Sequence, residues 1–452
     1  MQDGGTSGVE LRVVATSQMF RSLRYRSARL FFVGLSVSQI GTWIQLTAMS
    51  LLVYRLTGKA ADVGITLLCQ FLPMLVLGVW AGAIADRADK QRMAFITQAL
   101  QAAQAIAIGV LELAGLANLG VVYFMSFVLG VIAAIDNPAR RGFVIELVEP
   151  EDISNVVSLN TAVMTGSRIF GPAIAALLVG PLGPGWLFIV NGISFAAILW
   201  PIATIDRSTR HIAAPAARGG TPVRDALRYV RGRHELLVIF VVFTVVGTFA
   251  FNYNVSFLKL ADDRFGSKTV FGWLLALSGV GSLVGSLMTA QRSRVTARWF
   301  FGAALILAVS GFGVSFAPNV WVAYAITVPL GGGGAAFIAS LNAISQQDSP
   351  PDMRGRLLAL GAVAFLGTTP IGAPITGWIA DHISAEWSLA YGSVAAILAV
   401  AVGAAARRRP DPVTADAAAS HRLDVPADEH PASAMHVDHA DGRGLVVEGG
   451  TG

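Results

Sequence analysis

Long apolar runs recur along this chain, and they constrain its fold more than any other feature. Each run is close to the roughly 17–25 residues that a helix needs to cross a bilayer. Spans inside lipid must satisfy their backbone hydrogen bonds internally, so they form helices. We therefore expect an all-α polytopic membrane protein with twelve transmembrane helices. The runs lie at 30–54, 63–85, 93–115, 119–137, 157–180, 186–205, 236–259, 269–290, 299–317, 320–341, 357–380 and 386–406.

The composition agrees with a membrane protein. Charged residues make up 13% of the 452 residues, and the mean hydropathy is +0.61. A soluble domain carries about 25% charged residues, so a soluble enzyme is disfavoured. The apolar run after Arg29 is too long for a cleavable signal peptide. The single cysteine, Cys69, cannot form an intrachain disulfide. No basic stripe lies outside the membrane-flanking segments, so we expect no nucleic-acid partner.

Basic residues alternate in density between the two sides of the predicted membrane. If both termini are cytoplasmic, 24 of the 33 Lys and Arg residues flank the spans on the inner side and 5 lie in outer loops. Positive charge near the ends of spans favours the cytoplasm. We expect a cell-membrane protein of the inner or plasma membrane, with cytoplasmic N- and C-termini and an even number of spans.

The two halves of the chain repeat a pattern. Pro150 lies 21 residues before Gly171, and Pro351 lies 21 residues before Gly372. Such repeats are common in transporters. We expect two pseudo-symmetric six-helix bundles joined by a linker. The predicted parts are a cytoplasmic arm 1–28, a first bundle 29–205, a cytoplasmic linker 206–235, a second bundle 236–406 and a disordered cytoplasmic tail 407–452.

One loop resembles a known signature. The segment after the second run resembles the loop 2–3 signature of the major facilitator superfamily, G-x-x-x-D-R-x-G-R-R/K, with Asp89 where glycine is usual. Its remaining positions are Gly82, Asp86, Arg87, Lys90 and Arg92. The resemblance implies a conformational gate, in which Asp86 holds the cytoplasmic side shut in the outward-open state. A carboxylate at a helix N-terminus is favourable by about 0.3–1 kcal/mol. The alternative is a loop whose charges only flank the membrane.

Further motifs resemble the enterobactin-exporter and macrolide-efflux branch of that superfamily. They are Gly41-Thr-Trp43-Ile-Gln45, Asn137-Pro138-Ala-Arg140-Arg141, Arg168-Ile-Phe-Gly171-Pro172 and Arg354-Gly355-Arg356. The pair Gly171-Pro172, with Ser167 four residues before the glycine, resembles the antiporter motif G-x3-G-P-x2-G-G. That resemblance implies export by exchange. The alternative is a kinked packing helix, because small residues let helices approach closely and proline bends them.

Charged residues inside predicted spans are functional by default. Arg168 lies near the middle of the fifth span, and Asp136 is the acid with a plausible reach to it. Their pair is either structural or part of proton or anionic-substrate binding. Proton coupling needs an acid that can be exposed alternately to the two sides. Asp136 is the better candidate, and Glu112 is the other.

Polar and aromatic residues of the spans are candidates for a substrate cavity, although interhelical hydrogen bonding explains each of them equally well. The candidates are Gln39, Trp43, Gln45, Gln70, Asn252, Asn254 and Asn342.

We expect a secondary transporter with alternating access, which exports amphipathic small molecules such as drugs, macrolides or siderophores. A proton gradient would drive it, because the chain has no nucleotide-binding motif. We expect no metal or other cofactor. We expect it to work as a monomer in the lipid bilayer and not to be an enzyme. Two alternatives stay open, a lysophospholipid flippase on the same fold and a membrane-embedded enzyme. The sequence does not specify the substrate.

Overall fold

The computed structural model of the chain describes residues 21–407, apart from 86, 212–221 and 367–368. In this part the chain is helical, with no strand. Predictions for residues 1–20 of the arm, for residues 212–221 of the linker and for residues 408–452 of the tail concern residues outside the described part. The α-helices are α2 (Arg26–Thr57), α3 (Ala60–Ala85), α4 (Lys90–Leu113), α5 (Leu119–Ile145), α6 (Ile153–Ser194), α7 (Ala196–Thr204), α8 (Pro222–Arg231), α9 (His234–Ala250), α10 (Tyr253–Asp263), α11 (Lys268–Ala290), α12 (Ala297–Ser315), α13 (Val320–Gln347), α14 (Pro351–Leu366), α15 (Thr369–His382) and α16 (Ala385–Arg407).

The helices confirm the predicted fold class. Eleven described segments are long and apolar enough to cross a membrane. One of them, Pro150–Thr204, has 55 residues, which is enough for two crossings. It contains a backbone break at Gly183, whose φ of 76° is left-handed and favours glycine. Pro181 and Pro184 flank this glycine. The break divides the segment close to the predicted boundary between spans five and six, so the twelve-span count is consistent with the structure.

The seventh span differs from the prediction of one continuous helix. It consists of α9 and α10, which are separated at Phe251 and Asn252. The Asn252 backbone leaves the helical region, and its Nδ2 donates to the carbonyl oxygen of Thr248 at 2.8 Å. An asparagine side chain can thus replace the backbone N–H that an unbroken helix would supply. The second half of this span is a separate short helix.

The two halves pack in the same order, as the internal repeat predicts. In the first half α2 packs on α6, α3 on α5, and α4 on α6. In the second half α9 packs on α16, α11 on α13, and α12 on α16. Glycine allows the close contact of α11 with α13: a Cβ at Gly281 would lie 1.8 Å from the carbonyl oxygen of Val328. Gly331 and Gly333 in the glycine run of α13 are packed as closely, against Ser278 and Leu307.

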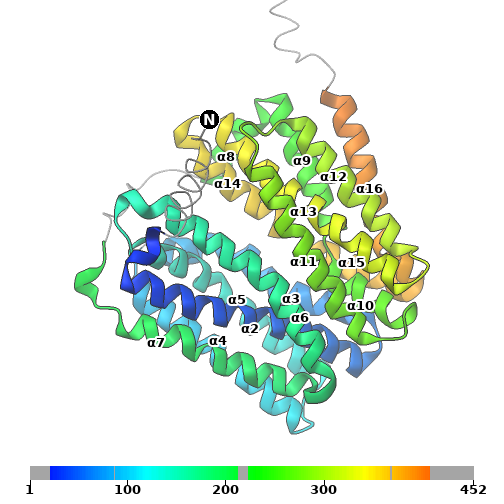
Figure 1. Cartoon of the computed structure of the whole chain (residues 1–452), viewed down its shortest axis with the longest axis horizontal. Helices are drawn as coiled ribbons and strands as arrows, with labels where there is room; N and C mark the ends of the chain where they lie inside the picture. The colour runs from blue at the N-terminus through cyan, green and yellow to red at the C-terminus, as the bar shows by residue number, and fades with distance from the viewer. Residues whose placement is uncertain (1–20, 86, 212–221, 367–368, 408–452) are drawn as a thin grey trace, which may run out of the picture. The chain divides into compact units, whose positions relative to one another are not determined.

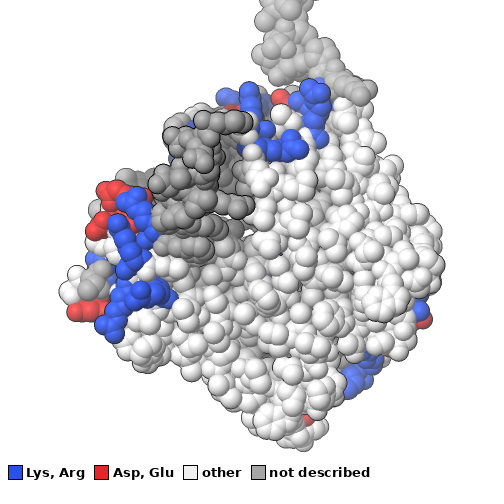
Figure 2. All heavy atoms as spheres, viewed as in Figure 1, with Lys and Arg blue, Asp and Glu red and all other residues white. Residues whose placement is uncertain are grey.

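Charge separates the described surface into two ends. Figure 2 shows Lys and Arg gathered along one end, a smaller group at the other, and a wide uncharged surface between them. We call the first the Arg-rich end; it is the end at which α3, α11 and α16 finish, next to Arg87, Arg292 and Arg407. We call the second the opposite end; there α10 finishes, next to Arg264. An uncharged belt between two charged rims is the surface that a bilayer covers.

The two halves meet mainly through α3 with α15 and α6 with α11 (Figure 1). A Cβ at Gly64 of α3 would lie 2.4 Å from the carbonyl oxygen of Ala373, and Gly377 of α15 is packed as closely on Ala60. These residues belong to the part of each helix near the opposite end. Toward the Arg-rich end, Gly78 and Gly82 of α3 have no described atom within 4 Å of a Cβ position. The contact between α3 and the second half is therefore close near one end only.

Candidate functional site

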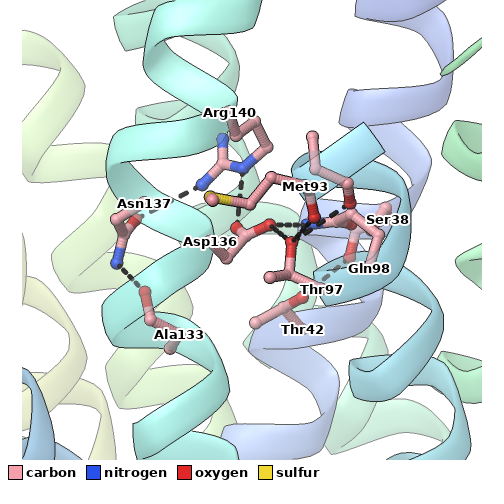
Figure 3. Close-up of polar contacts among 10 residues, drawn as sticks. Ser38, Thr42, Met93, Thr97, Gln98, Ala133, Asp136, Asn137 and Arg140 are labelled. Carbon is pink, nitrogen blue, oxygen red and sulfur yellow. Dashed lines mark hydrogen bonds and ion pairs between the residues drawn. The ribbon is translucent and has the colours of Figure 1, made fainter. Parts of the chain in front are cut away.

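Asp136 is the centre of a buried polar cluster between α4 and α5 (Figure 3). Only 4% of the residue is exposed. Its Oδ2 accepts from Arg140 Nε at 3.0 Å, and its Oδ1 accepts from Thr97 Oγ1 and Gln98 Nε2, both at 2.8 Å. Arg140 also donates to Asn137 Oδ1 at 3.4 Å. Both carboxylate oxygens are satisfied within one helical bundle, so the cluster joins α4 to α5.

The expected pair of Asp136 with Arg168 is wrong. Asp136 instead pairs with Arg140, one turn further along α5. Residues four apart lie on the same helix face, so this nearer partner needs no contact with another helix. No acid among the described residues lies within ion-pair distance of Arg168.

Arg168 lies between the two halves of the molecule. The next turn of α6 brings Gly171 against Trp43 of α2, where a Cβ would lie 2.3 Å from the tryptophan Cβ. The neighbouring Ile169 packs on Gly279 of α11, in the second half. The Arg168 side chain is exposed, and its guanidinium carbon is 5.1 Å from the centroid of the Trp43 ring. Arg168 thus lies next to helices from both halves, with an aromatic face as its described partner.

The break between α9 and α10 lies at a similar depth. Asn252 is about three turns from Asp263 at the opposite end, and Gly279 is about three turns from Lys268, the first residue of α11. Near the break, the Tyr253 hydroxyl and Asn254 Oδ1 are buried and have no hydrogen-bond partner.

Aromatic rings surround the same break. Phe251 packs edge-on against Phe365 at 5.0 Å, and Tyr253 stacks on Phe257 at 4.9 Å. The second half therefore presents a mainly aromatic group, with a few unpartnered polar atoms, at about the depth of Arg168.

The other cavity candidates divide into packed and accessible residues. Gln45 is inside the first bundle, where its Nε2 donates to Gln104 Oε1 at 3.0 Å and its Oε1 accepts from Asn191 Nδ2 at 2.5 Å. Gln39 is buried, and the carbonyl of Gln70 packs on Gly130. Asn342 is exposed. The structure brings Gln45 into a network that holds α2, α4 and α6 together.

The predicted gate is described only in part, because Asp86 lies outside the described residues. Arg87 is exposed. Asp89, the position that departs from the signature, caps α4 by accepting from the backbone N–H of Arg92 at 3.1 Å. It also pairs with Arg207 at 2.9 Å.

Charges around this loop come from the first bundle and from the start of the linker. Lys90 pairs with Glu146 at the end of α5 at 3.0 Å, and Arg210 pairs with Glu146 at 3.2 Å. Burial raises the pKa of Asp89, but the Arg92 N–H and the charges of Arg210 and Arg207 outweigh it and hold that pKa below its usual value. Asp89, which stands where glycine is usual, therefore caps α4 and provides the anion that pairs with Arg207 and Arg210.

The antiporter-like motif contacts both halves. Gly171 packs on α2, as described above, while the carbonyl oxygen of Pro172 would lie 3.0 Å from a Cβ at Gly272 of α11. Ser167 is buried and donates to the carbonyl oxygen of Val163 at 2.8 Å. The motif forms a close junction of three helices.

Sequence reasoning missed a contact at the opposite end. Asp381, near the end of α15, accepts from the backbone N–H groups of Ala60 at 2.9 Å and Ala61 at 2.7 Å. These are the first residues of α3, so a carboxylate of one half caps a helix of the other. Lys259 lies 3.8 Å from the same carboxylate. We call this contact the Asp381 cap. An acid at the end of an apolar run was the available signal.

Glu112, the second coupling candidate, lies at the same end and pairs with Arg55 of α2. No group of three or more His, Cys, Asp or Glu residues that could hold a metal ion occurs in the described part of the chain.

Eleven long apolar segments in two bundles, one of them long enough for two crossings, together with an arginine that has no acidic partner among the described residues, define a polytopic membrane transporter. The family described as transmembrane secretion effector, a branch of the major facilitator superfamily, matches residues 17–447, and the chain belongs to this family.

Curated relatives are transporters. The chain is 24% identical over 364 residues to the staphyloferrin A transporter of Staphylococcus aureus, covering 79% of this chain and 88% of that one. It is 26% identical to the multidrug efflux pump Tap of Mycolicibacterium fortuitum, covering 75% and 86%. It is 22% identical to macrolide efflux protein A of Streptococcus pyogenes, covering 83% and 96%.

Solved structures share the fold. The nucleoside transporter NupG superposes with a TM-score of 0.68 at 12% identity, covering 84% of this chain and 99% of that one. A bacterial homologue of the iron transporter ferroportin, in an inward-facing state, superposes with a TM-score of 0.67 at 15% identity, covering 85% and 99%.

Proposed function

We propose that this protein exports amphipathic small molecules across the cell membrane by alternating access. The observation that carries the proposal is the interface between the halves. It is capped and closely packed near the opposite end, while Gly78 and Gly82 of α3, toward the Arg-rich end, have no described atom close to their Cβ positions. Two rigid bundles in contact at one end can rock about the site between them. The similarity to efflux proteins supports the direction of transport.

The Arg-rich end faces the cytoplasm in this proposal, so the structure corresponds to an inward-open state. The distribution of Lys and Arg supports this orientation. A phosphatase fused after Arg409, active only outside the cytoplasm, should be silent, whereas one fused near Asp263 should be active. An active fusion after Arg409 would refute the orientation.

A proton gradient drives export, and Asp136 is the coupling acid. The support is its burial within α5. Its carboxylate pairs with Arg140, so a coupling role requires this pair to separate during the cycle. Glu112 is the alternative acid. The protein acts as a monomer on small molecules, without a bound cofactor and without catalysing a chemical reaction.

Transport into inside-out vesicles tests the function. With the vesicle interior acidified, a fluorescent amphipathic substrate should accumulate, and a protonophore should abolish the accumulation. Asp136→Asn should still bind the substrate but lose the dependence on the gradient, whereas Glu112→Gln should retain it. Accumulation that survives the protonophore would contradict proton coupling. Gradient dependence that survives Asp136→Asn would transfer the coupling role to another acid.

A further inference from the structure

We infer that the substrate of this transporter carries a carboxylate, which Arg168 binds between the two halves with Trp43 beside it. The inference rests on the proposed function and adds the chemical class of the substrate. It begins from the contrast with Arg140. That arginine is 5% exposed and neutralised by Asp136, whereas Arg168 is exposed and has no acidic partner among the described residues.

An arginine inside a membrane span is costly, because its charge is always present. Structural arginines offset this cost by pairing, as Arg140 does. Arg168 has only the face of Trp43, at 5.1 Å, and a cation–π contact contributes about 0.5–2 kcal/mol. The contact leaves the N–H groups at the edge of the guanidinium available. Those groups match the two oxygens of a carboxylate.

The position of Arg168 is that of a substrate contact. Gly171 packs on α2, and Ile169 packs on α11. Arg168 lies next to both of them on α6, so it lies at the junction of the two halves. A ligand there would touch both bundles, and its binding would depend on how they are arranged. A purely structural charge in the membrane would instead be expected inside one bundle, as the Asp136 cluster is.

The second half supplies the amphipathic part of the site. At a similar depth, the break between α9 and α10 carries the rings of Phe251 and Phe365. Aromatic rings fit an apolar or aromatic body. The site as a whole fits an amphipathic organic anion with one carboxylate.

Matched fluorescent probes test the inference on the purified full-length protein in nanodiscs. Pyrenebutyrate, its methyl ester and pyrenebutylamine share the same ring system and differ in charge. Binding is measured by energy transfer from tryptophan, with empty nanodiscs as the blank. The native protein should bind pyrenebutyrate about tenfold or more tightly than the ester, as expected for charge-assisted hydrogen bonds.

Substitutions assign the preference to one residue. Arg168→Gln should abolish the preference for the acid without changing the weak binding of the ester, and Arg168→Lys should retain part of it. Arg298→Gln is the matched control, because Arg298 is exposed at the Arg-rich end of α12; it should bind as the native protein does. The melting temperature of each variant shows whether it is folded.

If the native protein binds the three probes with equal affinity, or binds none of them, the inference is overturned. Native affinity of Arg168→Gln for pyrenebutyrate would overturn it too. Failure of the proposed function is distinguishable. Preferential binding of the acid without accumulation in vesicles would refute export alone. Gradient-driven accumulation of pyrenebutylamine, without a preference for the acid, would refute the carboxylate alone.

Discussion

The two ends of helix α3 differ in what they contact. At the opposite end, its first N–H groups are capped by Asp381 of the other half, and Gly64 packs directly on the backbone of α15. Toward the Arg-rich end, Gly78 and Gly82 of the same helix have open space beside them. Glycines on one helix thus have two different environments. The difference places the close contact of α3 with the second half near one end, and the proposed mechanism requires this contact to break when the transporter changes state.

The largest expected effect comes from filling the close contact. Gly64→Leu places a side chain where even a Cβ would lie 2.4 Å from the carbonyl oxygen of Ala373. Overpacking of this kind costs about 1–3 kcal/mol, and about 1.4 kcal/mol changes a conformational equilibrium tenfold. We expect the population that is open at the opposite end to rise by about fivefold to more than a hundredfold, measured as labelling of a cysteine introduced at Ala61.

Gly78→Leu on the same helix is the matched control. Its Cβ position has no described neighbour within 4 Å, so the substitution should leave labelling at the opposite end unchanged. Similar effects of the two substitutions would remove the distinction between the two ends of α3.

A smaller effect is expected from the Asp381 cap. Asp381→Ala removes the acceptor for two backbone N–H groups of α3. Loss of a helix cap costs about 0.5–2 kcal/mol, so labelling at Ala61 should increase by up to roughly thirtyfold. Asp348→Ala is the control, because Asp348 forms an exposed ion pair with Arg294 at 3.5 Å, which contributes little. Unchanged labelling in Asp381→Ala would show that the cap does not hold the halves together.

The smallest effect concerns Asp89, whose described contacts are with the first bundle and the start of the linker and not with the second bundle. Its folded-state pKa is lowered, mainly because the Arg92 N–H and the charges of Arg210 and Arg207 outweigh the effect of burial. A lowered pKa gives stability that is present above the unfolded value, about 3.9, and is lost as the pH falls through the folded value. The carboxylate is 30% exposed, so solvent reduces the effect.

We therefore expect Asp89→Asn to lower the melting temperature slightly at pH 6 and to have less effect below pH 4. Labelling at Ala61 should not change, because the contacts of Asp89 do not join the two halves. A change in labelling would show that the Asp89 network takes part in the conformational change.

Hydropathy was sufficient to predict the spans, and the internal repeat predicted the two bundles. These properties depend on the bilayer, which acts on every span in the same way. The break at Asn252 was not predicted, since it depends on one side chain bonding to its own helix. A hydropathy average over a whole span does not detect such a local hydrogen bond.

Individual polar contacts were harder to predict. The sequence contains the i, i+4 pair of Asp136 and Arg140. The prediction paired Asp136 with Arg168 instead, because an arginine near the middle of a span is unusual. The Asp381 cap joins residues about 320 positions apart. No local pattern encodes such a contact, because it depends on how the two bundles are arranged.

Reciprocal movement of the two ends tests the central claim most directly. In a Cys69→Ser background, spin labels at Lys59 and His382 report the opposite end, and labels at Arg87 and Gln346 report the Arg-rich end; all four positions are exposed. Electron–electron distances in nanodiscs should be short for the first pair and long for the second. Adding Gly64→Leu should lengthen the first distance and shorten the second. Distances that change in the same direction, or an unchanged second distance, would contradict alternating access.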